Sequence, residues 1–149
     1  MVHPDTGDIY LVSKGGNTAG LIRVMRYPGP LSSGETKQLE VVATYQLPPS
    51  AAWNPTTGAG AGNHQVTGGD IRPGGTGFAL RTYGRIWQFS GATFADALAD
   101  PYPTQLKLPV PSLDQQGEAF AFSPDGSRYF TIGEKSSTLR RSIVYFEPN

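Results

Sequence analysis

Hydrophobic and polar residues alternate along this chain in short runs that are separated by turn residues. The clearest case runs from Ala119 to Ile132, where two aromatic-rich runs flank the turn Ser123-Pro124-Asp125-Gly126. Proline presets φ for the first central turn position, aspartate caps its own backbone, and glycine accepts positive φ. Alternating runs of aromatic and β-branched residues are typical of strands. The segment therefore predicts a β-hairpin.

This hairpin pattern occurs three times. It is found 51 positions before Ser123, at 72–80, and again near the start of the chain, at 3–11. Repeats of about 50 residues are typical of propeller blades or of another repeat architecture. We therefore expect an all-β fold built from repeated hairpins.

The other apolar runs assign strands to three repeat units. Strands are expected at 9–13, 21–27 and 39–47; at 66–71, 77–83, 85–90 and 105–108; and at 118–122, 128–132 and 142–146. Only Met1-Val2-His3 remains to supply the strand before the first turn, so that strand is expected to be short. A short helix is expected at 93–99, because Phe94 and Leu98 are spaced for one face and Asp100-Pro101 ends the run.

The expected fold is a single β-propeller segment over residues 1–149. It consists of blade 1 (about 1–48), a loop (49–64), blade 2 (about 65–111) and blade 3 (about 112–149). About three four-stranded antiparallel blades are present, and the first and last are incomplete. Propellers typically close with 4–8 blades. Either the chain is part of a larger propeller, or another chain supplies the missing blades.

The run from Ala121 to Gly126, followed by Arg128-Tyr129-Phe130, resembles the repeat of TolB-type β-propellers. The chain as a whole is similar to the C-terminal blades of larger propellers in bacterial proteins, many of them exported. The resemblance implies a propeller fold and favours a secreted, periplasmic or cell-surface location. It does not specify an activity, because propellers serve as scaffolds, lectins, hydrolases and phytases alike.

Charge and composition exclude several classes of partner. Lys+Arg and Asp+Glu both number 12, so the balance gives no reason to expect nucleic-acid binding. Cysteine is absent, which excludes disulfides and thiolate metal sites. No apolar run approaches the roughly 18 residues of a membrane span, so membrane insertion is not expected.

Two carboxylates are the candidates for a metal site. In a propeller the first strand of each blade lines the central channel, which places Glu118 at the channel mouth and Asp70 on the neighbouring inner strand. Together they are suited to Ca²⁺ or another hard cation. The alternative, which we favour, is that they hydrogen-bond backbone amides or channel water. No other cofactor is expected.

Arg81 and Tyr83 end the second strand of the complete blade on the same face. Arg81 is placed either to clamp an anionic ligand or to pair with Asp70 as an internal strut, and we favour the strut. His3 and His64 are the only imidazoles, and no nucleophile motif accompanies them, so no catalytic triad is defined.

The 49–64 loop contains Trp53 and His64, and long loops of this kind are often functional. Trp53 lies beside Asn54-Pro55 and is a candidate for contact with a ligand or a partner. The glycines from Gly58 to Gly62 lack the Lys-Ser/Thr of a phosphate-binding loop and indicate a connector. Trp87, in the third strand of blade 2, is expected in the core.

The favoured function is a non-catalytic propeller module for partner binding or assembly, through self-association or with another propeller segment that completes the ring. The alternatives are part of a metal-dependent hydrolase, phytase- or esterase-like, that uses Glu118 and Asp70, and a sugar-binding propeller that uses Trp53 and Tyr83. If Phe122 is buried, its replacement by alanine is expected to cost about 3–5 kcal/mol. The strand at 142–146 is expected to be an exposed edge.

Overall fold

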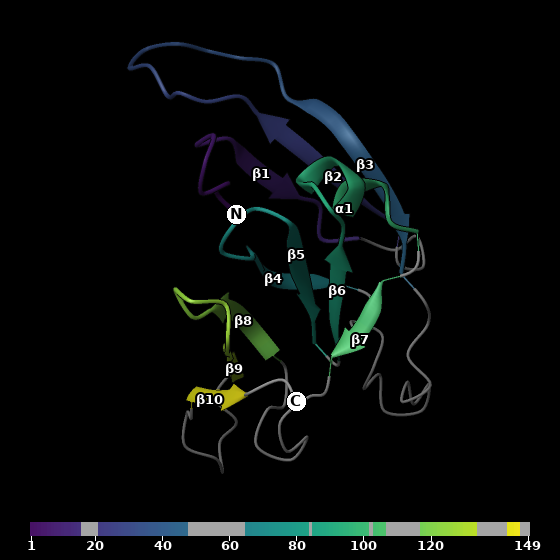
Figure 1. Ribbon diagram of the computed structural model, residues 1–149. Coiled ribbons are helices and arrows are strands. Elements are labelled where there is room, and N and C mark those ends of the chain that lie inside the picture. The colour runs from purple at the N-terminus through teal and green to yellow at the C-terminus, as the bar shows by residue number, and fades with distance from the viewer. Residues whose placement is uncertain are drawn as a thin grey trace.

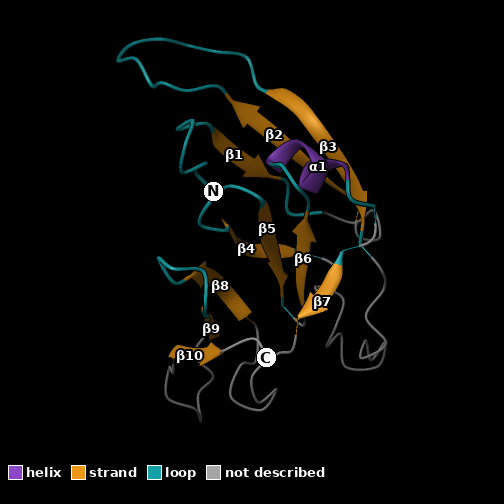
Figure 2. Ribbon diagram, viewed as in Figure 1, coloured by secondary structure: helices purple, strands orange, loops and turns teal. Residues whose placement is uncertain are grey.

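The computed structural model describes residues 1–15, 21–47, 65–83, 85–101, 103–106, 117–133 and 143–146. Within these ranges the strands form three antiparallel sheets that follow one another along the chain. The sheets are arranged as a fan, with the first at the top of Figure 1 and the third at the bottom. Figure 2 shows that strands make up nearly all of the regular structure. The fold is all-β, and the three sheets are β-propeller blades, as the sequence predicts.

The strands of each blade lie in chain order. Blade 1 contains β1 (Ile9–Val12), β2 (Leu21–Tyr27) and β3 (Glu40–Gln46). Blade 2 contains β4 (Val66–Ile71), β5 (Gly77–Thr82), β6 (Ile86–Ser90) and β7 (Thr104–Leu106), with the helix α1 (Phe94–Ala99) between β6 and β7. Blade 3 contains β8 (Gly117–Phe122), β9 (Tyr129–Gly133) and β10 (Ile143–Phe146). All the predicted strands are present, with ends that shift by one or two residues.

Residues 1–2 pair with β1 of blade 1. The Met1 ammonium donates to the Tyr10 carbonyl at 2.9 Å, and the Tyr10 amide donates to the Met1 carbonyl at 2.8 Å. Val2 forms an antiparallel bridge with Ile9. Residues 1–2 therefore occupy the inner-strand position of this blade.

The three blades share one register around the turn between their first and second strands. The residue pairs that close this turn are Val2–Ile9, Ile71–Phe78 and Phe122–Tyr129. Each pair has the same separation along the chain, so a position in one blade can be matched to its counterpart in the next.

Strand β5 lies at the centre of the molecule, because all of its residues are buried. Successive side chains of a strand point to opposite faces; thus Phe78 and Leu80 pack toward blade 1, and Ala79 packs toward blade 3. The core between blades 1 and 2 consists of Tyr10, Ile22, Val24, Tyr45, Leu47, Ile71, Phe78, Leu80, Trp87, Phe89, Phe94 and Ala97. The smaller core between blades 2 and 3 consists of Ala79, Ile86, Phe120 and Tyr129.

Two glycines allow the inner strands to approach one another. A Cβ atom on Gly68 would lie 3.0 Å from the Ala119 Cα, and one on Gly69 would lie 2.7 Å from the Ala79 carbonyl oxygen. Side chains at these positions would push β4 away from β8 and β5. Gly68 thus sets the spacing between the inner strands of blades 2 and 3, and Gly69 sets the spacing between β4 and β5 within blade 2.

The turn of the third hairpin has the geometry expected from its sequence. Gly126 has a positive φ of 68°, and the Ser127 amide donates to Asp125 Oδ1 at 3.0 Å. Hydrogen bonds from Ser123 and Ser127 lower the pKa of Asp125 to about 2. The aspartate therefore caps the turn in its ionised form.

The short helix begins where the sequence predicts. Thr93 is its N-cap and forms a capping box with Asp96, in which each side chain accepts from the other residue's backbone amide. Phe94 is buried in the core between blades 1 and 2, and Leu98 packs against it in part. The Tyr45 hydroxyl donates to the Leu98 carbonyl at 2.5 Å, which ties the helix to blade 1.

Phe122 is only half-buried, packing edge-on against Phe120 with ring centroids 4.9 Å apart. The expected cost of Phe122→Ala therefore falls below the range for a fully buried ring. Its counterpart Ile71 is buried. The difference arises because Ile71 lies between two blades, whereas Phe122 lies at the edge of a smaller core.

An ion pair between the buried Asp8 and the more exposed Arg26 lies in blade 1. The Asp8 carboxylate accepts from the Arg26 guanidinium at 2.8 Å and from the Gly29 amide at 2.7 Å. Burial by itself would raise the pKa of Asp8, but the hydrogen bonds from Gly29 and Arg26 outweigh it and lower that pKa. The ionised form is therefore favoured in the folded state.

This ion pair predicts a loss of stability in acid. Because the pKa of Asp8 is lower in the folded than in the unfolded state, its contribution is present above the unfolded value of about 3.9 and is lost as pH falls through the folded value. Unfolding free energy measured between about pH 6 and pH 2 should fall less steeply for Asp8→Asn than for the unmodified chain. Identical slopes would contradict a stabilising role for the ionised pair.

Candidate functional site

Four of the six predicted site residues lie in the part of the chain that the structure describes. They lie on the inner strands of blades 2 and 3 and at the end of β5. Trp53 and His64 lie outside the described residues, as does the whole 49–64 loop. Asp70 lies on β4, Glu118 lies on β8, Arg81 lies on β5, and Tyr83 directly follows β5.

Asp70 joins the inner strands of two blades. Its Oδ2 atom accepts from the Phe122 amide at 3.0 Å, and its Oδ1 atom accepts from the Ile71 amide at 2.9 Å. Both oxygens are thus engaged by backbone amides, which is the alternative favoured from the sequence. The carboxylate connects blade 2 to blade 3 across 52 positions of sequence.

Removing this connection should destabilise the chain. Asp70→Ala leaves the Phe122 amide without its carboxylate acceptor, and we expect the free energy of unfolding to fall by about 1.5–3 kcal/mol. Asp70→Asn keeps one acceptor oxygen and should lose less. Denaturant titration compares the two, and an Asp70→Ala midpoint equal to that of the unmodified chain would show that the hydrogen bond adds nothing.

Arg81 is fully buried and faces blade 3. Its guanidinium lies against the Cα of Gly117, so closely that a Cβ atom on this glycine would overlap it. The favoured strut with Asp70 is not formed, since these two described residues make no ion pair and Asp70 instead accepts from amides. In the β4–β5 ladder Asp70 pairs with Ala79, whereas Arg81 pairs with Gly68, two positions earlier on β4.

Glu118 is half-buried at a β-bulge in β8, between Gly117 and Ala119. Its counterpart in blade 2 is Thr67, which is also at a bulge and donates to the Gly117 carbonyl at 2.5 Å. Within the described residues, no group of three or more His, Asp or Glu side chains gathers in a way that could hold a metal ion. Asp70 thus lies between blades 2 and 3, and both of its carboxylate oxygens are already engaged by backbone amides.

Tyr83 connects blade 2 to blade 1. Its hydroxyl accepts from Lys14 Nζ at 3.3 Å, and the same ammonium lies 5.5 Å from the centre of its ring. The Tyr83 carbonyl accepts from the Gly117 amide at 3.4 Å. The residue therefore lies where all three blades meet.

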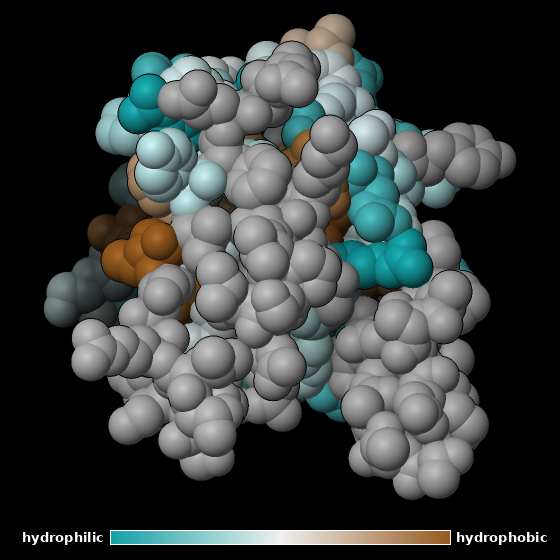
Figure 3. Space-filling view, turned by 90° about the horizontal axis from the view of Figure 1, so that it is seen from below, coloured by the Kyte–Doolittle hydropathy of each residue, from teal (hydrophilic) through white to brown (hydrophobic). Residues whose placement is uncertain are grey.

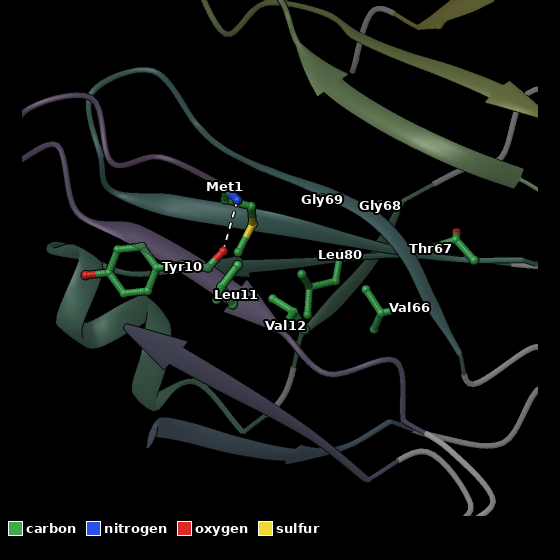
Figure 4. A pocket seen from close by; sticks show the side chains of 9 residues that line it. All are labelled: Met1, Tyr10, Leu11, Val12, Val66, Thr67, Gly68, Gly69 and Leu80. Atoms are coloured by element: carbon green, nitrogen blue, oxygen red, sulfur yellow. Dashed lines mark hydrogen bonds between the residues drawn. The ribbon is translucent and has the colours of Figure 1, made fainter. Parts of the chain in front are cut away.

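A pocket of about 220 Å³ opens between Met1 and β1 of blade 1 and β4 of blade 2 (Figure 4). Figure 4 shows the side chains of Met1, Val12 and Leu80 around it. The residues that line it are Met1, Tyr10, Leu11, Val12, Val66, Thr67, Gly68, Gly69 and Leu80. No acidic, basic or imidazole side chain is among them, so this pocket offers apolar contact rather than acid–base chemistry.

An exposed apolar surface lies on the side of blade 3 that is turned away from blade 2, which we call the open face of blade 3. Pairing across the three strands places small and large apolar residues side by side on it. It consists of Ala119, Ala121, Phe130, Ile132, Ile143 and Tyr145. A hollow of about 210 Å³ lies on this face. Figure 3, which looks up from the side of β10, shows hydrophobic residues at the surface on the left of the view.

Blade 1 has a corresponding open face on the side turned away from blade 2. Leu11 pairs with Met25, which pairs with Val41, so the three residues form one row across the sheet. Val2 joins this row as the counterpart of Ile71, which packs toward the preceding blade. The open face of blade 1 therefore consists of Val2, Leu11, Met25 and Val41.

These open faces are partly visible in the sequence. The alternation in the hairpins places Ala119, Ala121 and Phe130 on one side, and the exposed edge at 142–146 is predicted. Two structural contacts have no sequence signal: the packing of Arg81 on Gly117 and the hydrogen bond from the Phe122 amide to Asp70. Both join residues of different blades.

Comparison with known proteins gives a structural similarity at low sequence identity. No family model matches the sequence, and no curated protein matches it significantly. Among solved structures, the chain is similar to the β-propeller domain of Cps50 (Swd1) from Myceliophteria thermophila, with a TM-score of 0.47 and 11% sequence identity over 92% of this chain. This chain spans 37% of the length of that structure. Our assignment of propeller blades is based on strand order and on the packing between the sheets.

No helix in the described part of the chain is both long and apolar enough to cross a bilayer.

Proposed function

We propose that residues 1–149 form a non-catalytic β-propeller module that binds another polypeptide through its two open blade faces. The blades are of the TolB type in this interpretation, on the basis of the turn Ser123-Pro124-Asp125-Gly126. The module completes its ring of blades by this binding, either with its own copies or with another propeller segment.

One observation carries the proposal. Six large hydrophobic side chains are exposed in the described residues, and five of them lie on the two open faces. These five are Val2, Leu11, Val41, Ile143 and Tyr145. The sixth, Leu31, lies in the β2–β3 connection. Apolar patches of this kind mark interaction sites in soluble proteins, and the edge strand β10 adds backbone groups that can pair with a partner.

Light scattering on the purified chain tests the proposal. We expect particles heavier than 15.9 kDa, and we expect Ile143→Glu to reduce their mass because a charge in an apolar interface is costly. Leu31→Glu is the matched control, since it places the same charge on a similarly exposed leucine away from both faces. A monodisperse monomer that melts cooperatively would overturn the proposal.

A further inference from the structure

The turn between β8 and β9 contains an aspartate followed directly by a glycine, Asp125-Gly126. No other aspartate or asparagine in the full sequence precedes a glycine. In this dipeptide the backbone nitrogen can reach the preceding side chain most easily, because glycine has no Cβ atom to hinder the approach. The equivalent positions of the other two turns are Asp5-Thr6 and Gly74-Gly75. The third turn therefore carries a reactivity that the other two lack.

The reaction available to this dipeptide is cyclisation. The Gly126 nitrogen attacks the side-chain carboxyl carbon of Asp125; a C–N bond forms, the carboxyl C–O bond breaks, and the amide proton leaves with that oxygen as water. A solvent water molecule then opens the succinimide ring at either carbonyl. Opening at one carbonyl restores aspartate. Opening at the other leaves isoaspartate, in which the main chain runs through the side-chain methylene.

Hydrogen bonds engage both reacting groups in the folded turn. The Gly126 amide donates to the Ser123 carbonyl at 2.8 Å. Asp125 Oδ1 accepts from the Ser123 hydroxyl and from the Ser127 amide, and Oδ2 accepts from the Ser127 hydroxyl at 2.8 Å. These bonds keep the carboxyl ionised, and a carboxylate is a poorer electrophile than the neutral acid. The turn thus holds the nitrogen and the carboxyl carbon in unreactive states.

Packing against blade 2 limits the movement of this turn. Gly126 is buried, and a Cβ atom on it would lie 3.6 Å from Arg72 Nε and from Pro73 Cδ. On the strand before the turn, the Phe122 amide is held by the Asp70 carboxylate at 3.0 Å. The nitrogen can therefore reach the carboxyl carbon only after the turn moves away from blade 2.

We propose that Asp125-Gly126 is a site of spontaneous isoaspartate formation that the folded turn keeps unreactive and that opening of blade 3 exposes. The product has one more main-chain carbon in the turn. Because turn geometry sets the register of a hairpin, the pair Phe122–Tyr129 that closes the turn cannot re-form in its original geometry. The modification is thus an irreversible chemical record that blade 3 has opened.

Incubation of the whole chain at neutral pH, once folded and once unfolded in urea, tests the site. Isoaspartate at position 125 is measured by peptide mass spectrometry. We expect it to form at least about tenfold more slowly in the folded chain, because a protected segment reacts only while it is open. Asp5, which precedes a threonine, is the internal comparison and should give little isoaspartate in either sample. Equal rates at position 125, or no isoaspartate there in urea, would overturn the proposal.

Two variants test whether the contacts of the turn give the protection. Ser127→Ala removes a hydroxyl that donates to Asp125, and Asp70→Ala removes the carboxylate that holds the Phe122 amide. Each should form isoaspartate at position 125 faster than the unmodified chain while circular dichroism shows a folded protein. A variant that does not fold should react at the rate measured in urea. Ser32→Ala, at an exposed serine between β2 and β3, is the matched control and should leave the rate unchanged. If neither variant reacts faster than this control, the proposed protection by the turn is wrong.

Discussion

Replacement of Phe78 by alanine is expected to lower the free energy of unfolding by about 3–5 kcal/mol, the usual cost of deleting a fully buried aromatic ring. Phe78 is completely buried on β5. Its ring stacks on Phe89 with centroids 4.5 Å apart and contacts Phe94 at 5.6 Å. The loss combines this aromatic packing with a cavity at the junction of blades 1 and 2. Denaturant unfolding followed by circular dichroism measures it.

Leu31→Ala provides the comparison for this variant. Leu31 is 63% exposed, so its truncation should change the free energy of unfolding by no more than about 0.5 kcal/mol. If Phe78→Ala cost as little as this control, the core between blades 1 and 2 would not be the main source of stability. A variant that folds into a less compact structure would show a smaller slope of unfolding free energy against denaturant concentration.

Gly117→Ala is expected to destabilise the chain by about 3 kcal/mol, the upper part of the range for overpacking a buried site. An added Cβ atom would overlap the guanidinium of Arg81, which is itself fully buried and has little room to move. Strand β8 would be pushed away from β5, and the core between blades 2 and 3 would open. Thermal or denaturant unfolding measures the loss.

A double-mutant cycle identifies the cause. In an Arg81→Ala background the space beside Gly117 is vacant, so the added methyl group should cost much less than it does in the unmodified chain. Coupling between positions in contact is commonly about 0.5–3 kcal/mol. Additive effects would mean that Gly117 is needed for its backbone conformation and not for its contact with Arg81.

Several features of this protein follow from local sequence alone. The hairpin around Ser123-Pro124-Asp125-Gly126, its two earlier copies and the capped helix after Thr93 are all present as predicted. These elements depend on alternation, turn residues and caps, which act over a few positions.

The position of each side chain between blades was decided by the tertiary structure. From the sequence, Asp70 had two plausible roles and Arg81 had two, and the predicted ion pair between them is absent. Asp70 instead accepts from an amide 52 positions away, and Arg81 lies on Gly117, a residue without a side chain to signal the contact. Strand pattern specifies which residues share a face of one sheet. Only the packing of one sheet on the next determines what that face contacts, because contacts between blades join residues far apart in the chain.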